Sequence, residues 1–123
     1  MTNIFELTTR PDEKLFFSQG DTNDPRMGEI VRFDPEHYQS SEIVILGCPE
    51  DEGVIRNRGR KGTSEAPAAI RDQFYRLTTF NIKKRIFDLG NTVIGSTLEE
   101  THDTHAEIVK QVLRDGKRLI VLG

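Results

Sequence analysis

Three short, largely apolar runs give this chain most of its capacity to form a core. They are Ile43–Gly47, Ile86–Gly90 and residues 118–123, and each ends at a glycine. Continuous apolar runs of this kind are typical of parallel strands that are covered on both faces. Because only 35% of the 123 residues are hydrophobic while 30% are charged, the buried side chains must be concentrated in such runs. We therefore predict three strands, and we expect residues 118–123 to be buried on both faces.

A helix is predicted between the first two strands. Pro67 suits the first turn of a helix, where the backbone N–H that proline lacks is not needed. Ile70, Phe74 and Leu77 follow at the spacing i, i+4, i+7, which places them on one face. We expect this face to pack on the sheet. The segment before Pro67 is glycine-rich and charged, and it indicates a long loop.

The clearest helical pattern lies between the second and third strands. Thr97 and Glu100 match a Thr-x-x-Glu capping box, and Asp115-Gly116 fits a left-handed C-cap. Charged side chains gather on one side of the helical wheel, so we expect the other side to face the core, with His102 and His105 projecting into it. The residues of the expected core face are Leu98, Ala106, Ile108, Val109, Val112 and Leu113.

The order strand, helix, strand, helix, strand predicts an α/β fold with a parallel sheet and right-handed crossovers. We place this βαβαβ unit in residues 41–123 and expect residues 1–40 to form an N-terminal arm with at most short turns. Two helices wound in one direction cover one face only, so we expect the other face to be bare unless the arm shields it. The apolar residues expected to anchor the arm are Phe5, Leu7, Leu15, Phe16 and Phe17.

Composition argues against several classes of protein. No apolar stretch approaches the ~20 residues that cross a bilayer, and the N-terminus lacks the order of a signal peptide. The formal net charge of −3 argues against broad attraction to nucleic acid or anionic membranes. The single cysteine, Cys48, excludes an internal disulfide and fits a reducing compartment. We expect a cytoplasmic protein without nucleic-acid or membrane partners.

Several side chains of catalytic type have a simpler structural interpretation. His102 and His105 lie one helical turn apart and could hold a metal, but a metal site usually needs a third protein ligand, so a core or interface pair is favoured. The adjacent carboxylates of Glu50–Glu52 point in different directions and indicate a solvated turn rather than an acid/base pair. Cys48 has no activating base or cation nearby in sequence, so it is interpreted as a residue that fills a strand end.

A basic segment, residues 56–63, lies between the first strand and the first helix, where an anion could bind. The glycines at 47, 53, 59 and 62 match neither the dinucleotide-binding fingerprint nor the P-loop. Two interpretations remain: a solvated loop, or a loop that lines the entry path of a substrate with carboxylates. The four cations of this segment are too few and too local to form a nucleic-acid surface.

Taken together, three segments resemble the N-terminal signature of the ureohydrolases, the family of arginase, agmatinase and formimidoylglutamase. They read GCPEDEGV at 47–54, NRGRKG at 57–62 and APAAIR at 66–71. The Asp-Glu-Gly-Val start and the Asn-x-Gly-Arg segment make formimidoylglutamase-type members the most similar. The resemblance covers about residues 43–123. It implies a partial three-layer α/β/α, arginase-like fold with a mainly parallel sheet, truncated after the third strand.

The resemblance also implies an activity for the full-length protein. In this family a hydroxide that bridges two manganese ions attacks an amidino or guanidino carbon. The implied small-molecule substrate is N-formimidoyl-glutamate, which yields glutamate and formamide, and the implied assembly is a homo-oligomer. The metal ligands of the family lie in a Gly-Gly turn that carries His or Asn, in Asp-x-His-x-Asp and in a late Asp-x-Asp, and none of these motifs occurs here.

We therefore expect no catalytic or metal-binding residue in this chain, and no hydrolysis by residues 1–123 alone. The first metal-binding motif is expected directly after Gly123. By the resemblance, Asn57, Arg58 and Arg60 lie near the mouth of the active site and bind substrate carboxylates. The alternative is a stand-alone, non-catalytic module that pairs with another chain through its arm and open sheet, because an exposed edge and a bare apolar face favour association.

Overall fold

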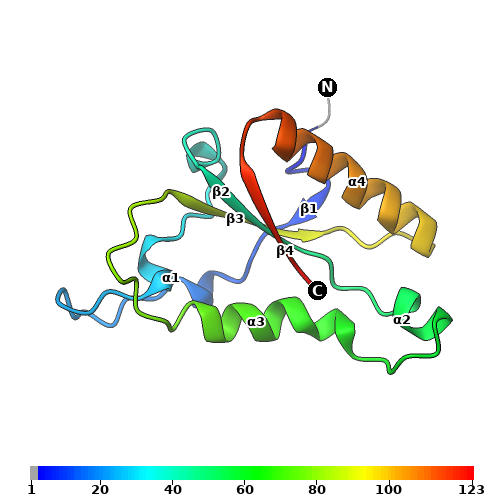
Figure 1. Ribbon diagram of the computed structural model, residues 1–123, viewed down its shortest axis with the longest axis horizontal. Coiled ribbons are helices and arrows are strands. Elements are labelled where there is room, and N and C mark those ends of the chain that lie inside the picture. Colours follow the sequence, from blue (N-terminus) through cyan, green and yellow to red (C-terminus); the bar gives the residue numbers. More distant parts are fainter. Residues whose placement is uncertain (1–2) are drawn as a thin grey trace.

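The computed structural model describes residues 3–123, in which a four-stranded sheet lies between helices (Figure 1). The strands are β1 (Thr8–Thr9), β2 (Ile43–Gly47), β3 (Ile86–Thr92) and β4 (Arg118–Leu122), in the spatial order β1-β3-β2-β4. β2 runs parallel to β3 and to β4, whereas β1 runs antiparallel to β3. The three predicted parallel strands are confirmed, and β1 is an addition from the arm.

The helices alternate with these strands along the chain. The α-helices are α1 (Met27–Ile30), α2 (Glu52–Arg56), α3 (Ala66–Phe74) and α4 (Leu98–Arg114). Three 3-10 helices complete the set: η1 (Glu13–Leu15), η2 (Pro35–His37) and η3 (Thr63–Glu65). The segment before α3, expected to be a long loop, therefore contains both α2 and η3. Among the described residues, no helix combines the length and the apolar character needed to cross a membrane.

α3 and α4 lie on opposite faces of the sheet, which gives the three layers of an α/β/α fold (Figure 1). The expectation that both helices cover one face was wrong, and the strand order explains why. The connection from β2 to β3 moves across the sheet in one direction, and the connection from β3 to β4 returns past β2 in the other. Two crossovers of the same hand that run in opposite directions put their helices on opposite faces.

Each face of the sheet has its own core. On the α4 face, Val44, Leu46, Phe87 and Leu89 pack against Ile108 and Val112, and on the other face Ile45 and Ile86 pack with Met27, Val31 and Tyr75. This split follows from the alternation of side chains along a strand. A register shift between Ile45 and Leu46, opposite the segment from Asp88 to Gly90, interrupts the alternation where β3 approaches its end.

The arm has more regular structure than expected, and it packs on both faces. Ile4 lies in the core on the α4 face, with Phe5 and Leu7 packed beside it, while Leu15 and Phe16 pack on the other face. Phe17 does not anchor the arm, because it is 44% exposed. The arm thus supplies an edge strand, helix α1 and apolar cover, and it is not merely extended chain.

α4 matches its predicted boundaries, with differences in which side chains it buries. The Thr97 hydroxyl accepts a hydrogen bond from the Glu100 N–H at 3.1 Å, as expected of the N-cap, although the Glu100 carboxylate bonds Ser96 rather than Thr97. Gly116 has the expected left-handed conformation, with φ of 77°. Three side chains that were expected on the core face are exposed instead, namely His102, Ala106 and Leu113. The buried stripe of α4 consists of Leu98, Thr101, Ile108 and Val112, and the helical periodicity places the three exposed side chains to one side of that stripe.

α3 buries a different face from the one its apolar spacing predicted. Pro67, Arg71 and the adjoining Tyr75 are buried, whereas Ile70 is 43% and Leu77 is 56% exposed. Arg71 and Tyr75 turn toward the sheet because Asp88 in β3 offers them a buried partner. The spacing of apolar residues could not reveal this, since it treats arginine as a surface residue.

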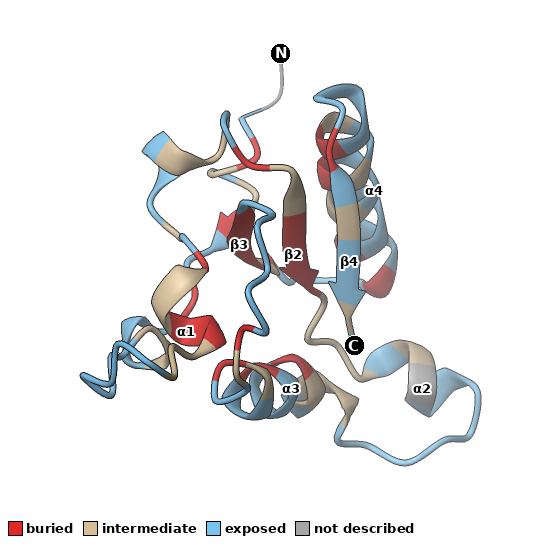
Figure 2. Ribbon diagram, turned by 60° about the vertical axis from the view of Figure 1, so that its left-hand side comes forward, coloured by how far each residue is buried: buried red, intermediate tan, exposed pale blue. Residues whose placement is uncertain are grey.

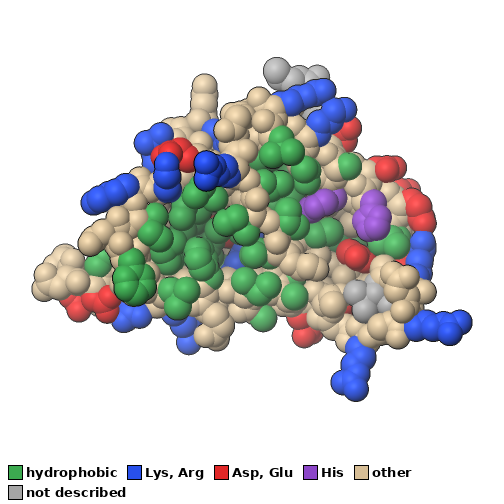
Figure 3. All heavy atoms as spheres, viewed as in Figure 1, with side chains coloured by type: hydrophobic (Ala, Val, Ile, Leu, Met, Phe, Trp, Pro, Cys, Tyr) green, Lys and Arg blue, Asp and Glu red, His purple; other side chains and the backbone are tan. Residues whose placement is uncertain are grey.

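β4 is an exposed edge strand, not a strand buried on both faces (Figure 2). Ile120 is 47% and Val121 48% exposed. Within the described residues β4 pairs with β2 alone, so its other side carries no neighbouring strand. Hydrophobic side chains gather over α3 and β4 in the space-filling view (Figure 3). Ile70, Phe74, Ile120 and Leu122, which line one apolar pocket there, are called the α3/β4 patch below.

Candidate functional site

The candidate residues gather where the parallel strands β2 and β3 end. β2 continues through Cys48 into α2, the basic loop (residues 57–62) and η3, while β3 continues into the turn 93–97 that starts α4. Ligands of open parallel sheets bind at this end of the strands. A cavity of about 160 Å³ separates the two segments and is lined by Glu50, Asp51 and Thr97, among others.

Asp51 fastens the far end of the basic loop. Its Oδ1 accepts hydrogen bonds from the backbone N–H groups of Gly62 at 3.0 Å and Ser64 at 2.7 Å, and from the Thr63 hydroxyl at 2.9 Å. Its Oδ2 accepts the Ser64 hydroxyl at 2.9 Å. These hydrogen bonds, led by that of the Ser64 N–H, lower the pKa of Asp51 to about 2. Asp51 is thus engaged by the loop, and the prediction of a solvated turn was wrong for this residue.

Arg56 fastens the near end of the loop. Its guanidinium donates to Glu99 at 2.6 Å and to Glu52 at 3.0 Å, which ties α2 to the first turn of α4. The pairing with Glu99, and then with Glu52, raises the pKa of Arg56, and the same contact lowers the pKa of Glu99. Arg56 is therefore occupied by structural contacts and is not available to a ligand in this arrangement.

The three residues predicted to bind substrate carboxylates lie between the contacts of Arg56 and those of Asp51, and all three are exposed. The Asn57 amide donates to the Gly53 carbonyl at 3.1 Å, so it closes the end of α2. Arg58 has a left-handed backbone conformation, with φ of 63°. Within residues 3–123, neither Arg58 nor Arg60 forms an ion pair or a side-chain hydrogen bond. Of the three predicted residues, the structure thus leaves Arg58 and Arg60 unpaired on one loop and gives Asn57 a structural contact.

A buried polar network, which the sequence analysis missed, lies beneath this end of the sheet. The Arg71 guanidinium bonds both carboxylate oxygens of Asp88, at 2.9 Å and 3.0 Å, and donates to the Gly90 carbonyl at 2.8 Å and the Asn91 side-chain oxygen at 2.6 Å. The Tyr75 hydroxyl donates to Asp88 at 2.5 Å. Burial, together with the Asp88 charge, raises the pKa of Tyr75. An aspartate inside an apolar run was the one signal in the sequence that could have revealed it.

The histidine pair and Cys48 lie in surroundings that favour their neutral forms or leave them exposed. His102 is exposed, whereas His105 is half-buried, with its Nδ1 at 2.7 Å from the Thr92 hydroxyl. Burial, and then the neighbouring His102, lower the pKa of His105. Burial, and then Glu50, raise the pKa of Cys48, which opposes formation of a thiolate.

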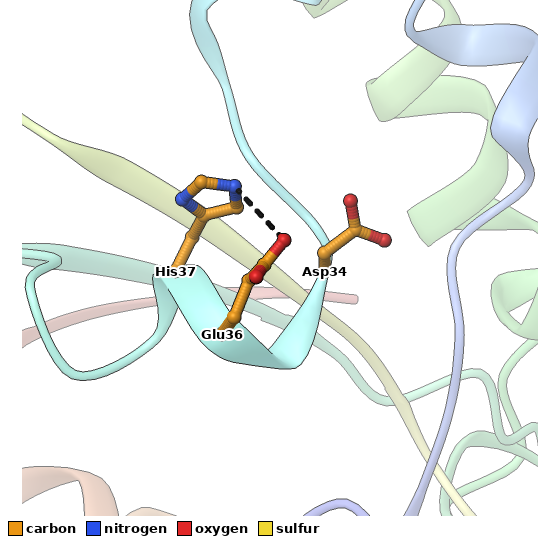
Figure 4. Close-up of side chains that lie close together, drawn as sticks. All are labelled: Asp34, Glu36 and His37. Carbon is orange, nitrogen blue, oxygen red and sulfur yellow. Dashed lines mark ion pairs between the residues drawn. The ribbon is translucent and has the colours of Figure 1, made fainter.

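The described residues do not supply a binuclear metal site where the strands end. In residues 3–123, the one group of three or more candidate ligands that converges is Asp34, Glu36 and His37, whose ligand atoms lie within 4.8 Å of one another (Figure 4). Asp34 and Glu36 are exposed, and this group precedes β2, at the opposite end of that strand from the basic loop. The side chains where β2 and β3 end therefore do not fit a pair of manganese ions, and no metal chemistry is assigned to them.

Proteins of known structure share this fold. The chain is similar to a Mn²⁺-bound formiminoglutamase of Trypanosoma cruzi, with a TM-score of 0.71 and 35% identity, over 81% of this chain and 36% of that one. It is also similar to an arginase superfamily protein of the same organism, with a TM-score of 0.72 and 35% identity, over 83% of this chain and 36% of that one. Both likenesses agree with the predicted three-layer fold.

Curated sequences give the same picture. The formimidoylglutamase of Klebsiella pneumoniae is 38% identical over 93 residues, which is 75% of this chain and 29% of the relative, and that of Salmonella heidelberg is 38% identical over 92 residues, 74% of this chain and 29% of the relative. This chain thus spans under a third of the length of these relatives. The family model for arginases matches residues 41–123. The chain therefore belongs to the arginase family.

Proposed function

We propose that this chain forms the N-terminal part of a hydrolase that splits N-formimidoyl-L-glutamate into glutamate and formamide. In this reaction water attacks the formimino carbon, and the bond from that carbon to the glutamate nitrogen breaks. The observation that carries the proposal is the basic loop, which holds Arg58 and Arg60 as unpaired cations at the end of the sheet where ligands bind. The similarity to formimidoylglutamases over the same residues supports it.

The chemistry of the substrate matches the charge of the loop. N-formimidoyl-L-glutamate carries two carboxylates, and an arginine guanidinium pairs with a carboxylate through two parallel hydrogen bonds. Arg58 and Arg60 are free for such contacts, whereas Arg56 and Arg71 are already paired with carboxylates of this chain. The proposed role of the chain is therefore to receive and orient the glutamate end of the substrate.

The hydrolytic step itself lies outside what these residues supply. Manganese, where the family binds it, would provide the hydroxide, and the side chains where β2 and β3 end do not converge to hold it. We expect the purified chain with Mn²⁺ to release no formamide from N-formimidoyl-L-glutamate. Release of formamide at a rate that scales with the concentration of the chain would contradict this expectation.

A chimera tests the proposed substrate. Residues 41–123 of this chain replace the matching segment of the Klebsiella pneumoniae relative. Turnover in Mn²⁺ is measured as formamide release from N-formimidoyl-L-glutamate and as urea release from L-arginine and from agmatine. We expect turnover of the first substrate, and we expect Arg60→Ala to raise KM about tenfold or more with kcat retained, because the lost ion pair serves binding. The matched control is Arg76→Ala, which changes an exposed arginine that lies just after α3.

The outcomes separate the parts of the proposal. Turnover of arginine or agmatine in place of the formimino compound would overturn the substrate assignment. An unchanged KM in both Arg58→Ala and Arg60→Ala would overturn the role of the basic loop while leaving the substrate in place. A folded, Mn²⁺-loaded chimera that turns over none of the three compounds would overturn the hydrolase assignment for this chain.

A second candidate function is non-catalytic association, and the exposed side of β4 favours it. β4 has one strand partner within the described residues, and the α3/β4 patch lies beside it with Ile70 and Ile120 each more than two-fifths exposed. Unpaired strand edges and apolar patches of this kind are sites where another chain can pair. Sedimentation velocity of the chain and of Ile120→Lys tests it. A defined dimer that Ile120→Lys dissociates favours a module, whereas a monomer in both samples speaks against it.

A further inference from the structure

We propose that Asp51 is a positioning residue that fixes the placement of Arg58 and Arg60 for the substrate carboxylates. The inference rests on the proposed function, and it adds a residue whose own charge has the wrong sign to bind that substrate. Asp51 lies directly before α2, and its hydrogen-bond partners are the last residue of the basic loop, Gly62, and the two residues that follow it, Thr63 and Ser64. One carboxylate thus joins the two ends of the loop.

The hydrogen bonds from Gly62, Thr63 and Ser64 to Asp51 are the main contacts that hold the two ends of the basic loop together. Asp51 accepts from two backbone N–H groups and two hydroxyls, so both of its oxygens are used. The Thr63 hydroxyl also lies 3.0 Å from the Glu50 carbonyl oxygen, so its single hydrogen is shared between Glu50 and Asp51. Hydrogen bonds to a charged acceptor are stronger than those between neutral groups. A loop held in this way keeps its geometry at low entropic cost when a ligand binds.

The residues between the closures have few contacts of their own. The Asn57 amide bonds Gly53, and the Arg58 N–H donates to the Ile55 carbonyl at 2.9 Å. The side chains of Arg58 and Arg60 are exposed to solvent. The left-handed backbone of Arg58 adds strain that the surroundings must hold. Without the hydrogen bonds to Asp51, the segment from Arg58 to Lys61 is held by side-chain and backbone contacts only at α2. The distance between the two guanidinium groups would then vary.

The direction in which Asp51→Ala changes the affinity for the substrate distinguishes positioning from a simple effect of charge. Asp51 is an anion near two cations, so deleting its charge should strengthen the binding of a dicarboxylate if charge alone mattered. If Asp51 acts by positioning, Asp51→Ala weakens binding even though it removes a negative charge. Asp51→Asn keeps an acceptor oxygen for the Gly62 and Ser64 N–H groups, and it should restore part of the order that alanine loses.

The experiment uses the full chain and two readouts on one sample. Amide hydrogen exchange follows the Gly62 and Ser64 N–H groups, and NMR titration with N-formimidoyl-L-glutamate gives Kd. In Asp51→Ala we expect exchange of both amides to accelerate about tenfold or more, because a local closure is lost without global unfolding, and we expect Kd to rise about threefold or more. For Asp51→Asn we expect exchange rates and a Kd between those of the unchanged chain and those of Asp51→Ala. Asp72→Ala, which deletes the same charge on α3, is the control and should leave both readouts unchanged.

Each outcome has one meaning. Unchanged exchange at Gly62 and Ser64 in Asp51→Ala overturns the inference. Faster exchange with tighter binding also overturns it, because charge and not position would then govern the ligand. If Arg60→Ala weakens binding and Asp51→Ala does not, the proposed function stands and the positioning role falls. If neither Arg58→Ala nor Arg60→Ala changes Kd, the proposed substrate contact falls, and faster exchange then supports only a structural closure.

Discussion

Arg71 and Asp88 form a two-point ion pair in which the side chains are 4% and 0% exposed, at 2.9 Å and 3.0 Å between nitrogen and oxygen. The pair joins the buried face of α3 to β3, and two further N–H groups of Arg71 bond Gly90 and Asn91. Taking two charges out of water is costly, and each charge of the pair compensates the other, so removing one side chain would leave the other as an uncompensated buried charge. The pair therefore couples the helix to the end of the strand where the candidate site begins.

Removing one member of this pair should destabilise the chain severely. We expect Arg71→Met to lower the free energy of unfolding by about 3–5 kcal/mol, because Asp88 would be left buried without its cation. Urea denaturation measures the loss. Arg76→Met is the matched control, since that arginine pairs with Asp72 at 3.4 Å and is 62% exposed, and it should change stability by less than about 0.5 kcal/mol. Equal losses in the two variants would contradict the assigned importance of the buried pair.

The same pair shows how far the sequence could predict this structure. The three parallel strands and α4 follow from apolar runs, caps and periodicity, which are local properties. The buried face of α3 could not be predicted, because Arg71 finds Asp88 seventeen residues away and only after the sheet has formed. The opposite faces of α3 and α4 depend on strand order, which no local pattern records. For the same reason the sequence placed Arg58 and Arg60 on a loop but did not reveal that Asp51 closes it.

Gly90 should be far less replaceable than Gly116. Both have positive φ, 92° and 77°, so each substitution carries a backbone cost that is typically about 1 kcal/mol. A Cβ on Gly90 would in addition lie 1.8 Å from the Thr9 carbonyl oxygen, whereas a Cβ on Gly116 meets nothing within 4 Å. We expect Gly90→Ala to displace β1 from β3. Faster exchange of the Val93 N–H, which donates to Leu7 at 2.9 Å, would report this, and exchange unchanged relative to Gly116→Ala would contradict it.

His105 should make stability fall on mild acidification. Burial, and then His102, lower its pKa in the folded chain below the ordinary value of 6.5. Above that value the ring is neutral in both states, so it has no effect. As the pH falls below it, the unfolded chain takes up the proton first and stability decreases. We expect His102→Gln to raise the pKa of His105, because a neighbouring positive charge is removed. NMR titration of the His105 ring measures the shift, and an unchanged midpoint would refute the coupling.

Asp51 should hold the basic loop closed until strongly acidic pH. Its pKa is lowered from 3.8 to about 2, chiefly by the Ser64 N–H. A carboxylate with a lowered pKa contributes order that is fully present above its unfolded value and is lost as the pH falls through the folded value. The Gly62 and Ser64 amide shifts should therefore titrate with a midpoint near pH 2, with Val44 in the central strand as the reference for global unfolding. Asp51→Asn should abolish this transition. A midpoint at the ordinary 3.8 would mean that the four hydrogen bonds do not favour the charged form, and the closure would then be too weak to position the two arginines.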